Sequence, residues 1–426
     1  TNTPTQTSTP TATSTPTDTS TPTHTPTITN TPTPSPTPAP SGWWDPRWRA
    51  RIEILIHGGG HARTDRVAET TINFTQKLQD AGLSGTFDDA HLRVLEVDAD
   101  GFVIDYETPF QFDRDPDYQA ASNASGKLVL LLQGQLAPFQ TRRFFAYFDT
   151  VENSNDKTPA QVITRVSYQD DVAYEGQLSY AITTSNATYY YHKRGSGFAS
   201  MVDSGANDWI GYRPSGGSAG DYRGVPNLAT YRRGATVALF HPGEVKAYST
   251  ILNSGPLKLT IKSQTDANDW AKIWEIYPYY ATMTLLLKPD DKQYWILYEG
   301  TPGGRISEGD YYVLPDGVRR DIDTVLETDL PGEEWIYFGD DEKQAVLYVI
   351  NHQEDEALDC HYVLQGNMTV FGFGRDRNAV NSKLLNALPG SFTYGFTPTG
   401  DHATVQEKIR AAYKPLAVTV GNGEHP

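Results

Sequence analysis

The first 40 residues repeat a dipeptide that forbids both a helix and an interior β-strand. Threonine stands at every odd position from Thr1 to Thr33 and again at Thr37, and proline fills ten of the even positions up to Pro40. Proline fixes its own φ, keeps the preceding residue out of the helical region and has no N–H to donate. Polyproline II is the regular conformation that remains, and at ~3.1 Å per residue the tract would reach roughly 120 Å. We therefore expect an extended stalk over residues 1–42.

The stalk composition also predicts covalent sugar. A polyproline II rod has three residues per turn, so a two-residue repeat sends successive threonines to all three faces. Threonine and serine mixed with proline are typical of O-glycosylated stalks, and a disordered spacer is the alternative. The expected carriers of O-glycans are Thr3, Thr5, Thr7, Thr9, Thr11, Thr13, Thr15, Thr17, Thr19, Thr21, Thr23, Thr25, Thr27, Thr29, Thr31, Thr33 and Thr37.

Composition narrows the class of the remaining chain. Aromatic residues make up 12% of the 426 residues and only 3 are methionine, which favours strands over a helical bundle. The net charge of −17 argues against a nucleic-acid partner, and no apolar run approaches the ~18 residues needed to span a membrane. The single Cys360 excludes an intrachain disulfide, and we expect it to be buried. The chain opens without methionine or an apolar leader, so we expect an export signal to have been removed or left out.

The sequence changes character at Trp43, and strand-like runs from there predict an all-β body of two β-sandwich-like domains. The first domain is expected over 43–151 and the second, larger one over 160–426, with a turn-rich boundary at 152–159. A short C-terminal helix is predicted from Asp401, as N-cap, to Tyr413. The strands expected in the first domain are 50–56, a hairpin of 92–97 with 102–112, and a second pair of 127–134 with 142–149; residues 416–420 are expected as a final strand or an edge strand for a partner.

Two glycine-rich motifs resemble parts of a hydrolase site. HGGGH at 57–61 and GGSAG at 216–220 are similar to the oxyanion loop and the nucleophile elbow of α/β-hydrolases. That elbow needs a strand before the serine and a helix after it, whereas Pro214 and Pro226 flank Ser218. We therefore expect Ser218 to lie in a glycine-rich loop and not to act as a nucleophile.

The segment 96–107 has the acidic spacing of a calcium loop. Glu96, Asp98, Asp100 and Glu107 occupy positions one, three, five and twelve, with Gly101 at position six. The flanks read as strands, and DADG is also a good hairpin turn. No cofactor is therefore expected, and a structural calcium ion on these four carboxylates is the alternative.

Loop-like segments between 189 and 304 hold the candidates for catalysis. Enzymes that cleave acidic sugars by β-elimination need a cation on the uronate and a tyrosine or histidine as acid and base. No spacing here is diagnostic, so turns with aromatic packing are the simpler interpretation. The catalytic candidates are Tyr191, His192, Arg223 and His241, with Arg213 and Glu299 beside them, and Trp209, Trp270, Trp274 and Trp295 could stack on sugars or fill the core.

The Thr/Pro tract resembles the O-glycosylated extracellular stalk and fibre proteins of environmental bacteria. The WWDPRWRAR opening at 43–51 is similar to the entry of uncharacterised secreted β-sandwich modules. The stalk resemblance covers the first 40 residues and is compositional. It implies a surface or matrix component and assigns no catalytic residue.

These features predict an extracellular or cell-surface structural glycoprotein that assembles with copies of itself. An extended arm that lies on the next subunit makes a heterologous contact, which builds a helical filament. Trp43, Trp44 and Trp48, directly after the arm, are the expected interface anchors. Two alternatives stay open: a lyase-like polysaccharide-processing enzyme and a glycan-binding adhesion module, each tethered by the Thr/Pro linker.

Overall fold

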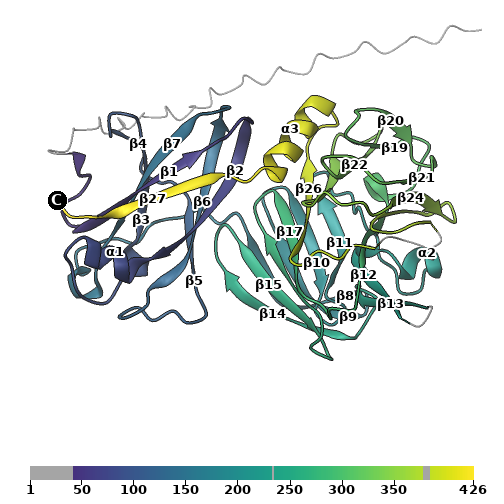
Figure 1. Ribbon diagram of the computed structural model, residues 1–426, viewed down its shortest axis with the longest axis horizontal. Helices are drawn as coiled ribbons and strands as arrows, with labels where there is room; N and C mark the ends of the chain where they lie inside the picture. The colour runs from purple at the N-terminus through teal and green to yellow at the C-terminus, as the bar shows by residue number, and fades with distance from the viewer. Residues whose placement is uncertain (1–41, 233–234, 378–383) are drawn as a thin grey trace, which may run out of the picture. The chain divides into compact units, whose positions relative to one another are not determined.

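The computed structural model describes residues 42–232, 235–377 and 384–426 (Figure 1). The expected stalk, with all of its expected glycan carriers, therefore lies outside the described residues except for Gly42. The described chain is built mainly of antiparallel β-sheets and ends in a short helix and a strand, which confirms the predicted all-β class. No helix in the described ranges is long and apolar enough to span a membrane.

Two sheets form the first sandwich. In spatial order, the β1 sheet contains β27 (Ala417–Glu424), β1 (Ala50–His57), β7 (Thr141–Phe148), β3 (Arg93–Val97) and β4 (Val103–Asp105), and the β2 sheet contains β2 (Arg63–Asn73), β6 (Ser125–Leu136) and β5 (Phe110–Arg114). Successive side chains of a strand point to opposite faces, so Ile52, Ile54 and Ile56 all enter the core. Helix α1 (Phe74–Asp80) follows β2, and the Asn73 side chain accepts a hydrogen bond from Gln76 N at its first turn.

The pairing in the first sandwich differs from the sequence expectation. Ranges 127–134 and 142–149 do not pair with each other, because β6 pairs with β2 and β5, and β7 pairs with β1 and β3. Both faces of β6 are covered, since Leu128 and Leu130 enter the sandwich core while Val129 and Leu131 pack against Tyr277 and its neighbours. A strand buried on both faces reads as one apolar run, and its sequence does not reveal its partner.

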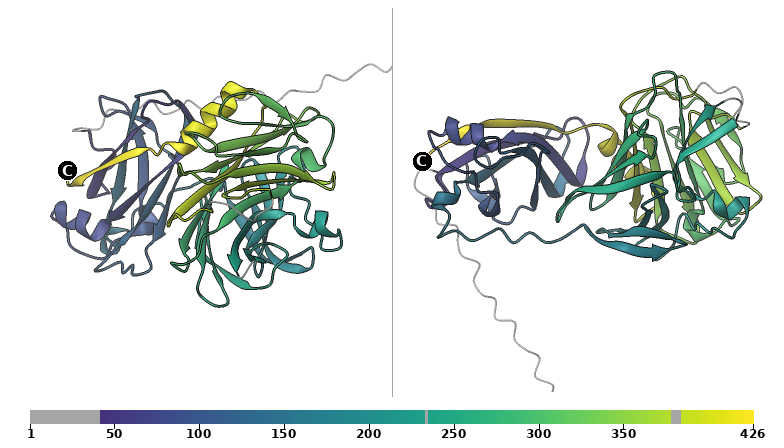
Figure 2. Two further views of the ribbon diagram at one scale, coloured as in Figure 1. Left: turned by 45° about the vertical axis from the view of Figure 1, so that its right-hand side comes forward. Right: turned by 90° about the horizontal axis from the view of Figure 1, so that it is seen from below.

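The last strand, β27, returns to the first sandwich. It pairs antiparallel with β1, from Arg51 opposite Glu424 to His57 opposite Ala417, and the yellow strand lies beside the purple one in both views of Figure 2. Residues 416–420 therefore contribute an edge strand to their own chain, although the sequence placed them in the second domain. The predicted turn-rich segment 152–159 does separate β7 from β8.

Two larger sheets form the second sandwich. The β18 sheet runs, in spatial order, through β21 (Leu326–Thr328), β24 (Asp359–Leu364), β25 (Met368–Phe373), β18 (Trp295–Gly300), β12 (Gly224–Arg232), β11 (Gly197–Asp203), β10 (Ala187–His192), β9 (Gln177–Thr183) and β8 (Ser167–Tyr174), with β13 (Ala235–Phe240) on β12. The β17 sheet runs through β14 (Ala247–Ser254), β15 (Leu259–Thr265), β16 (Ala271–Ile276), β17 (Tyr280–Leu287), β26 (Gly390–Thr397), β23 (Val346–Asn351), β22 (Trp335–Asp340), β19 (Asp310–Val313) and β20 (Arg319–Asp321).

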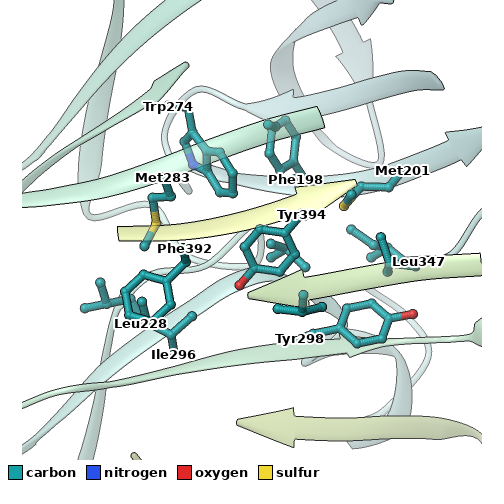
Figure 3. Packing of buried hydrophobic residues seen from close by; sticks show 14 of the residues in the cluster. Phe198, Met201, Leu228, Trp274, Met283, Ile296, Tyr298, Leu347, Phe392 and Tyr394 are labelled. Carbon is teal, nitrogen blue, oxygen red and sulfur yellow. The ribbon is translucent and has the colours of Figure 1, made fainter. Parts of the chain in front are cut away.

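The core of the second sandwich lies between these two sheets. Figure 3 shows side chains of both sheets converging there, and the rings of Phe198 and Trp274 meet edge to face at 4.6 Å. From β18, Ile296 and Tyr298 enter this core. The alternation of the strand therefore turns Trp295, Leu297 and Glu299 to the other face of the sheet, where the candidate site lies.

Helix α3 (His402–Tyr413) confirms the predicted C-terminal helix and its cap. The Asp401 carboxylate accepts a hydrogen bond of 3.0 Å from Thr404 N, as expected for an N-cap. At the other end, the buried guanidinium of Arg63 donates from Nη1 to the carbonyl oxygens of Ala411 (2.5 Å) and Lys414 (2.8 Å). Arg63 thus binds the end of α3 to the start of β2 and fixes the point from which β27 departs.

Candidate functional site

A cavity of about 940 Å³ lies on the face of the β18 sheet that points away from the core. We call it the β18 pocket. Strands of the β18 sheet form the floor of this pocket. Because successive side chains of a strand point to opposite faces, every second side chain of each strand faces the pocket. The lining residues include Asn227 of β12, Trp295, Leu297 and Glu299 of β18, Tyr362 and Leu364 of β24, Arg375, Ser218 and Asp221 of the short helix α2 (Ser218–Asp221), and the loop residues Tyr222 and His241.

Glu299 and Asn227 form the polar centre of the β18 pocket. The Asn227 Nδ2 donates a hydrogen bond of 2.7 Å to Glu299 Oε2, and the Glu299 side chain is 5% exposed. Burial raises the pKa of Glu299 to about 7, although the Asn227 hydrogen bond and the charge of Arg375 oppose the rise. The carboxyl can therefore exchange its proton near neutral pH. The other amide atom, Asn227 Oδ1, is buried without a hydrogen-bond donor among the described residues.

Arg375 brings a cation to the same pocket. It follows the end of β25, and its backbone N–H donates to Leu358 O at 2.7 Å. Its guanidinium carbon lies 5.9 Å from the Trp295 ring centre and 6.0 Å from the Tyr362 ring centre. Within the part of the chain that the structure describes, the buried Arg375 Nε has no acceptor. Two buried polar atoms that lack partners in one cavity favour a ligand or water that supplies them.

A loop with an exposed tyrosine forms the rim of the pocket. Tyr222 lines the pocket and is 53% exposed, so part of its surface is available to a ligand. The loop is held by His241, whose Nε2 lies 2.7 Å from Tyr222 O and whose Nδ1 accepts a bond from Gly243 N at 3.0 Å. Burial lowers the pKa of His241 to about 4, which keeps the ring neutral in these bonds. His241 therefore positions the rim, and both of its ring nitrogens are already engaged.

The structure does not bring the four catalytic candidates together. His241 lines the β18 pocket, but Tyr191 lies in the core between the sheets, 2.7 Å from Ser263 Oγ. His192 is buried with its Nδ1 2.8 Å from Pro242 O, and burial lowers its pKa. Arg223 donates to the carbonyl oxygens of Gly211 and Asn367. Each of these three side chains has a structural partner, although His192 Nε2 and Arg223 Nε lack one among the described residues. None of the three lines the β18 pocket, so its chemistry must come from other residues.

Ser218 begins the single-turn helix α2 (Ser218–Asp221) at the edge of the β18 pocket. Gly217 before it has φ +62°, which glycine adopts without strain, as expected of a glycine-rich loop. The HGGGH motif lies elsewhere, at the end of β1 in the first sandwich. The two motifs therefore belong to different domains and form no common oxyanion site.

The segment 96–107 forms the β3–β4 hairpin. Glu96 is bound by Arg142, and Asp98 Oδ1 accepts hydrogen bonds from Asp100 N at 3.0 Å and Phe102 N at 2.9 Å. Glu96 thus serves as the partner of Arg142, and Asp98 closes the turn. Across the described ranges, no group of three or more histidine, cysteine, aspartate or glutamate side chains could hold a metal ion, and Glu96, Asp98, Asp100 and Glu107 are within those ranges.

The tryptophans are mostly core residues. Trp209, Trp270 and Trp274 belong to the core of the second sandwich, and Trp295 is 1% exposed although its side chain borders the β18 pocket. Trp43 and Trp48 pack with Phe145 and Tyr147 on the outer face of the β1 sheet, while Trp44 is half-buried against them. Their role as contacts to another subunit stays a prediction. Cys360 is buried, as expected, and burial raises its pKa to about 12.

Sequence reasoning did not single out Asn227, Arg375 or Tyr362. Glu299 and Trp295 were noticed only among other polar or aromatic residues. The available signal was the charged or polar side chain at an alternate position of an apolar strand, as in WILYEG at 295–300 and GVPNLATYR at 224–232. That pattern places each residue on a face, but which strands are neighbours is a property of the long-range pairing.

Comparisons with known proteins support the fold and do not assign a family. No family model matches the sequence, and no curated protein matches it. A protein in glycosyl hydrolase family 38 from Enterococcus faecalis matches 87% of this chain and 47% of its own length, with 9% identity and a TM-score of 0.51. This chain thus spans about half of that structure, and the likeness shows the fold alone. A galactose mutarotase related enzyme from Lactobacillus acidophilus matches 55% of this chain and 99% of its own, with 10% identity and a TM-score of 0.36, too low to carry an argument.

Proposed function

We propose that this chain is an extracellular glycan-binding module, and that the β18 pocket is its binding site. The observation that carries the proposal is the polar centre of the pocket. Glu299, Asn227 and Arg375 offer a carboxyl, a carboxamide and a guanidinium within one cavity, and two of their atoms lack partners among the described residues. Sugars present several hydroxyl groups that both donate and accept, so they suit such a set of groups.

The aromatic rim supports the same proposal. A half-exposed tyrosine such as Tyr222 supplies an apolar face with a polar tip, which suits the alternating apolar and hydroxylated faces of a sugar ring. The fold likeness to part of a protein in glycosyl hydrolase family 38 also agrees with a carbohydrate ligand. Binding is favoured over turnover because His241, the histidine beside Glu299 in the pocket, has both ring nitrogens engaged by the backbone.

A glycan array probed with the full chain, followed by titration calorimetry on the glycans retained, tests this proposal. Glu299→Gln and Asn227→Ala should each weaken binding about tenfold or more, because each removes a hydrogen bond to the ligand. The matched control is Glu327→Gln, which removes an exposed carboxylate from β21. Equal binding by all four proteins, or no binding to any glycan, would count against the β18 pocket.

We propose a second function, assembly into a surface fibre, for the N-terminal tract. It is supported by the threonine periodicity and the proline content of residues 1–40. Where proline occupies consecutive even positions, as from Pro32 to Pro40, the remaining N–H groups of an extended segment would point to one edge, so that part of the arm can pair with the free edge of a sheet on one side only. Covalent O-glycans on the threonines belong to the same proposal, and intact-mass measurement of native material checks them.

Deletion of the arm tests the fibre. The full chain should form filaments in negative-stain images, and a version that starts at Ser41 should stay dispersed. Normal polymerisation of the shortened protein would rule out the arm as the assembling element.

A further inference from the structure

Two arginines lie at the Tyr362 side of the β18 pocket, and Arg375 is one of its lining residues; a further lining cation, Lys246, is paired with Glu244 at 2.5 Å. Arg375 and Arg377 both approach the Tyr362 ring, with guanidinium carbons 6.0 Å and 5.9 Å from its centre. Tyr362 belongs to β24, and Arg375 and Arg377 follow β25, the next strand of the sheet. Two guanidinium groups beside one ring create a local positive field in a chain whose net charge is −17.

The hydrogen-bond acceptors lie on the other side. Glu299 is on β18 and Asn227 on β12, the two strands that follow β25 in spatial order. Asp221, at the end of helix α2, adds a carboxylate whose Oδ1 is buried without a donor among the described residues. Adjacent strands are about 4.8 Å apart, so β25 and β12 are separated by about 10 Å. A ligand that lies across the strands thus meets cations at one end and acceptors at the other.

We propose that the ligand of the β18 pocket is an acidic saccharide, with a uronate carboxylate against Arg375 and Arg377 and its hydroxyl groups donating to Glu299 and Asn227. This inference rests on the proposed glycan-binding function. Arginine suits a carboxylate because its planar fork can donate two parallel hydrogen bonds. A carboxylate would supply the acceptor that the buried Arg375 Nε lacks, and a hydroxyl would supply the donor that Asn227 Oδ1 lacks. A neutral sugar can offer a hydroxyl to each atom, but a carboxylate forms the stronger, charge-assisted bond with the guanidinium and can accept from two of its N–H groups.

The experiment compares each acidic oligosaccharide with its own neutral derivative. Oligogalacturonate and oligoglucuronate are titrated into the full chain by calorimetry, beside the same oligosaccharides after reduction of their carboxyl groups. At least one acidic form should bind about tenfold more tightly than its reduced form. The preference should shrink as sodium chloride rises from 50 to 500 mM, because salt screens exposed charges.

Substitutions test whether the two arginines cause the preference for the acidic form. Arg377→Gln, at an exposed position, should reduce the affinity for the acidic form about tenfold and leave that for the reduced form within about twofold. Arg375→Gln should reduce the affinity for the acidic form about tenfold and that for the reduced form by less, because a neutral hydroxyl loses a weaker bond than a carboxylate. The control Arg319→Gln removes the same charge from an exposed ion pair with Asp341 on the β17 sheet and should change neither. Thermal unfolding of each variant shows whether it is folded, and Arg377→Gln keeps the test valid if Arg375→Gln is unstable.

The outcomes separate the two proposals. Equal affinity for acidic and reduced oligosaccharides would overturn the acidic ligand and leave glycan binding intact. An acidic preference that survives both arginine substitutions would overturn the assigned cations. Absence of binding to every oligosaccharide and to the wider array would overturn the glycan function and this inference with it.

Discussion

Lys258 Nζ lies 2.8 Å from Asp113 Oδ2 and so connects the second sandwich to strand β5 of the first. The same ammonium group is 3.0 Å from Glu69 Oε1 and 3.2 Å from Glu275 Oε1, and the lysine side chain is 2% exposed. Burial alone would lower the pKa of Lys258, but the three carboxylates raise it above its ordinary value. One buried cation thus balances carboxylates from segments that are far apart in the sequence.

Removal of this cation should be strongly destabilising. Lys258→Met keeps most of the side-chain volume and leaves the carboxylates with Lys127, which pairs with Glu69 and Glu275 and is 37% exposed. Asp113 loses its ammonium partner, so we expect a loss of about 3–5 kcal/mol in the free energy of unfolding. Urea unfolding at pH 7 measures it. Lys292→Met, which removes a partly exposed pair with Asp291, should cost less than about 1 kcal/mol. A similar small loss for both variants would show that the buried ion cluster contributes little.

The buried Glu334, which directly precedes β22, should make stability fall with rising pH, together with its carboxyl neighbours. Glu334 is buried beside Asp355, and burial, followed by the charge of Asp355, raises its pKa from 4.5 to about 8. The native state therefore holds a proton that the unfolded state has lost between pH 5 and pH 8. The free energy of unfolding should decrease across that window by up to about 1.4 kcal/mol per pH unit from this group.

Glu334→Gln tests this dependence. The amide cannot ionise, so the variant should gain stability relative to the parent as pH rises from 5.5 to 8.5 in urea unfolding. Glu327→Gln, at an exposed position of β21, should follow the parent curve at every pH. Parallel curves for the parent and Glu334→Gln would place the pKa of Glu334 near its ordinary value.

Local patterns in the sequence predicted what depends on local physics. The helix at the C-terminus was found from its Asp401 cap and the following Pro415, because a cap and a stop act within one turn. The strand-like runs predicted at 50–56, 92–97, 127–134 and 142–149 were found as β1, β3, β6 and β7. The partners of β6 and of β7 were not predicted correctly, and the pairing of β27 with β1 was not predicted. The latter joins residues about 370 positions apart, such as Arg51 and Glu424. Such pairing depends on which edges remain open once both sandwiches have formed.

The candidate site was only partly visible for the same reason. His241 and Glu299 were selected as polar residues in loop-like or strand-like segments, and both do line the β18 pocket. Tyr191 and His192 come from equally polar segments and are engaged in the interior instead. Polarity alone does not distinguish a pocket residue from a buried residue with a partner. The distinction needs the face of the strand and the identity of its neighbours.

Substitution of the tryptophans after the stalk should distinguish a role in folding from a role in assembly. Trp48 is 1% exposed and its Nε1 donates to His91 O at 2.8 Å, so Trp48→Ala should cost about 3–5 kcal/mol of unfolding free energy. Trp44 is half-buried on Trp48 and Tyr147, so Trp44→Ala should cost less. If Trp44 anchors a neighbouring subunit, its variant should fold and fail to form filaments in negative-stain images. Normal filaments in the Trp44→Ala variant would mean that Trp44 does not anchor a neighbouring subunit.

Ligand binding should depend on pH through Glu299. Its pKa of about 7 means that the carboxyl is largely protonated at pH 6 and largely ionised at pH 8. A hydroxyl that donates to an ionised carboxylate forms a stronger bond than one that donates to a neutral acid, so affinity should rise roughly fivefold to tenfold from pH 6 to pH 8.

Calorimetric titrations of the same glycan at pH 6, 7 and 8 measure the dependence, and buffers of different ionisation enthalpy report the proton released on binding below pH 7. Glu299→Gln should bind more weakly and with an affinity that no longer changes over this range, because the amide has no proton to lose. The exposed control Glu327→Gln should keep the dependence of the parent. The same pH dependence in Glu299→Gln would assign the proton to another group, and affinity that falls with pH in the parent would mean that the protonated carboxyl is the binding form.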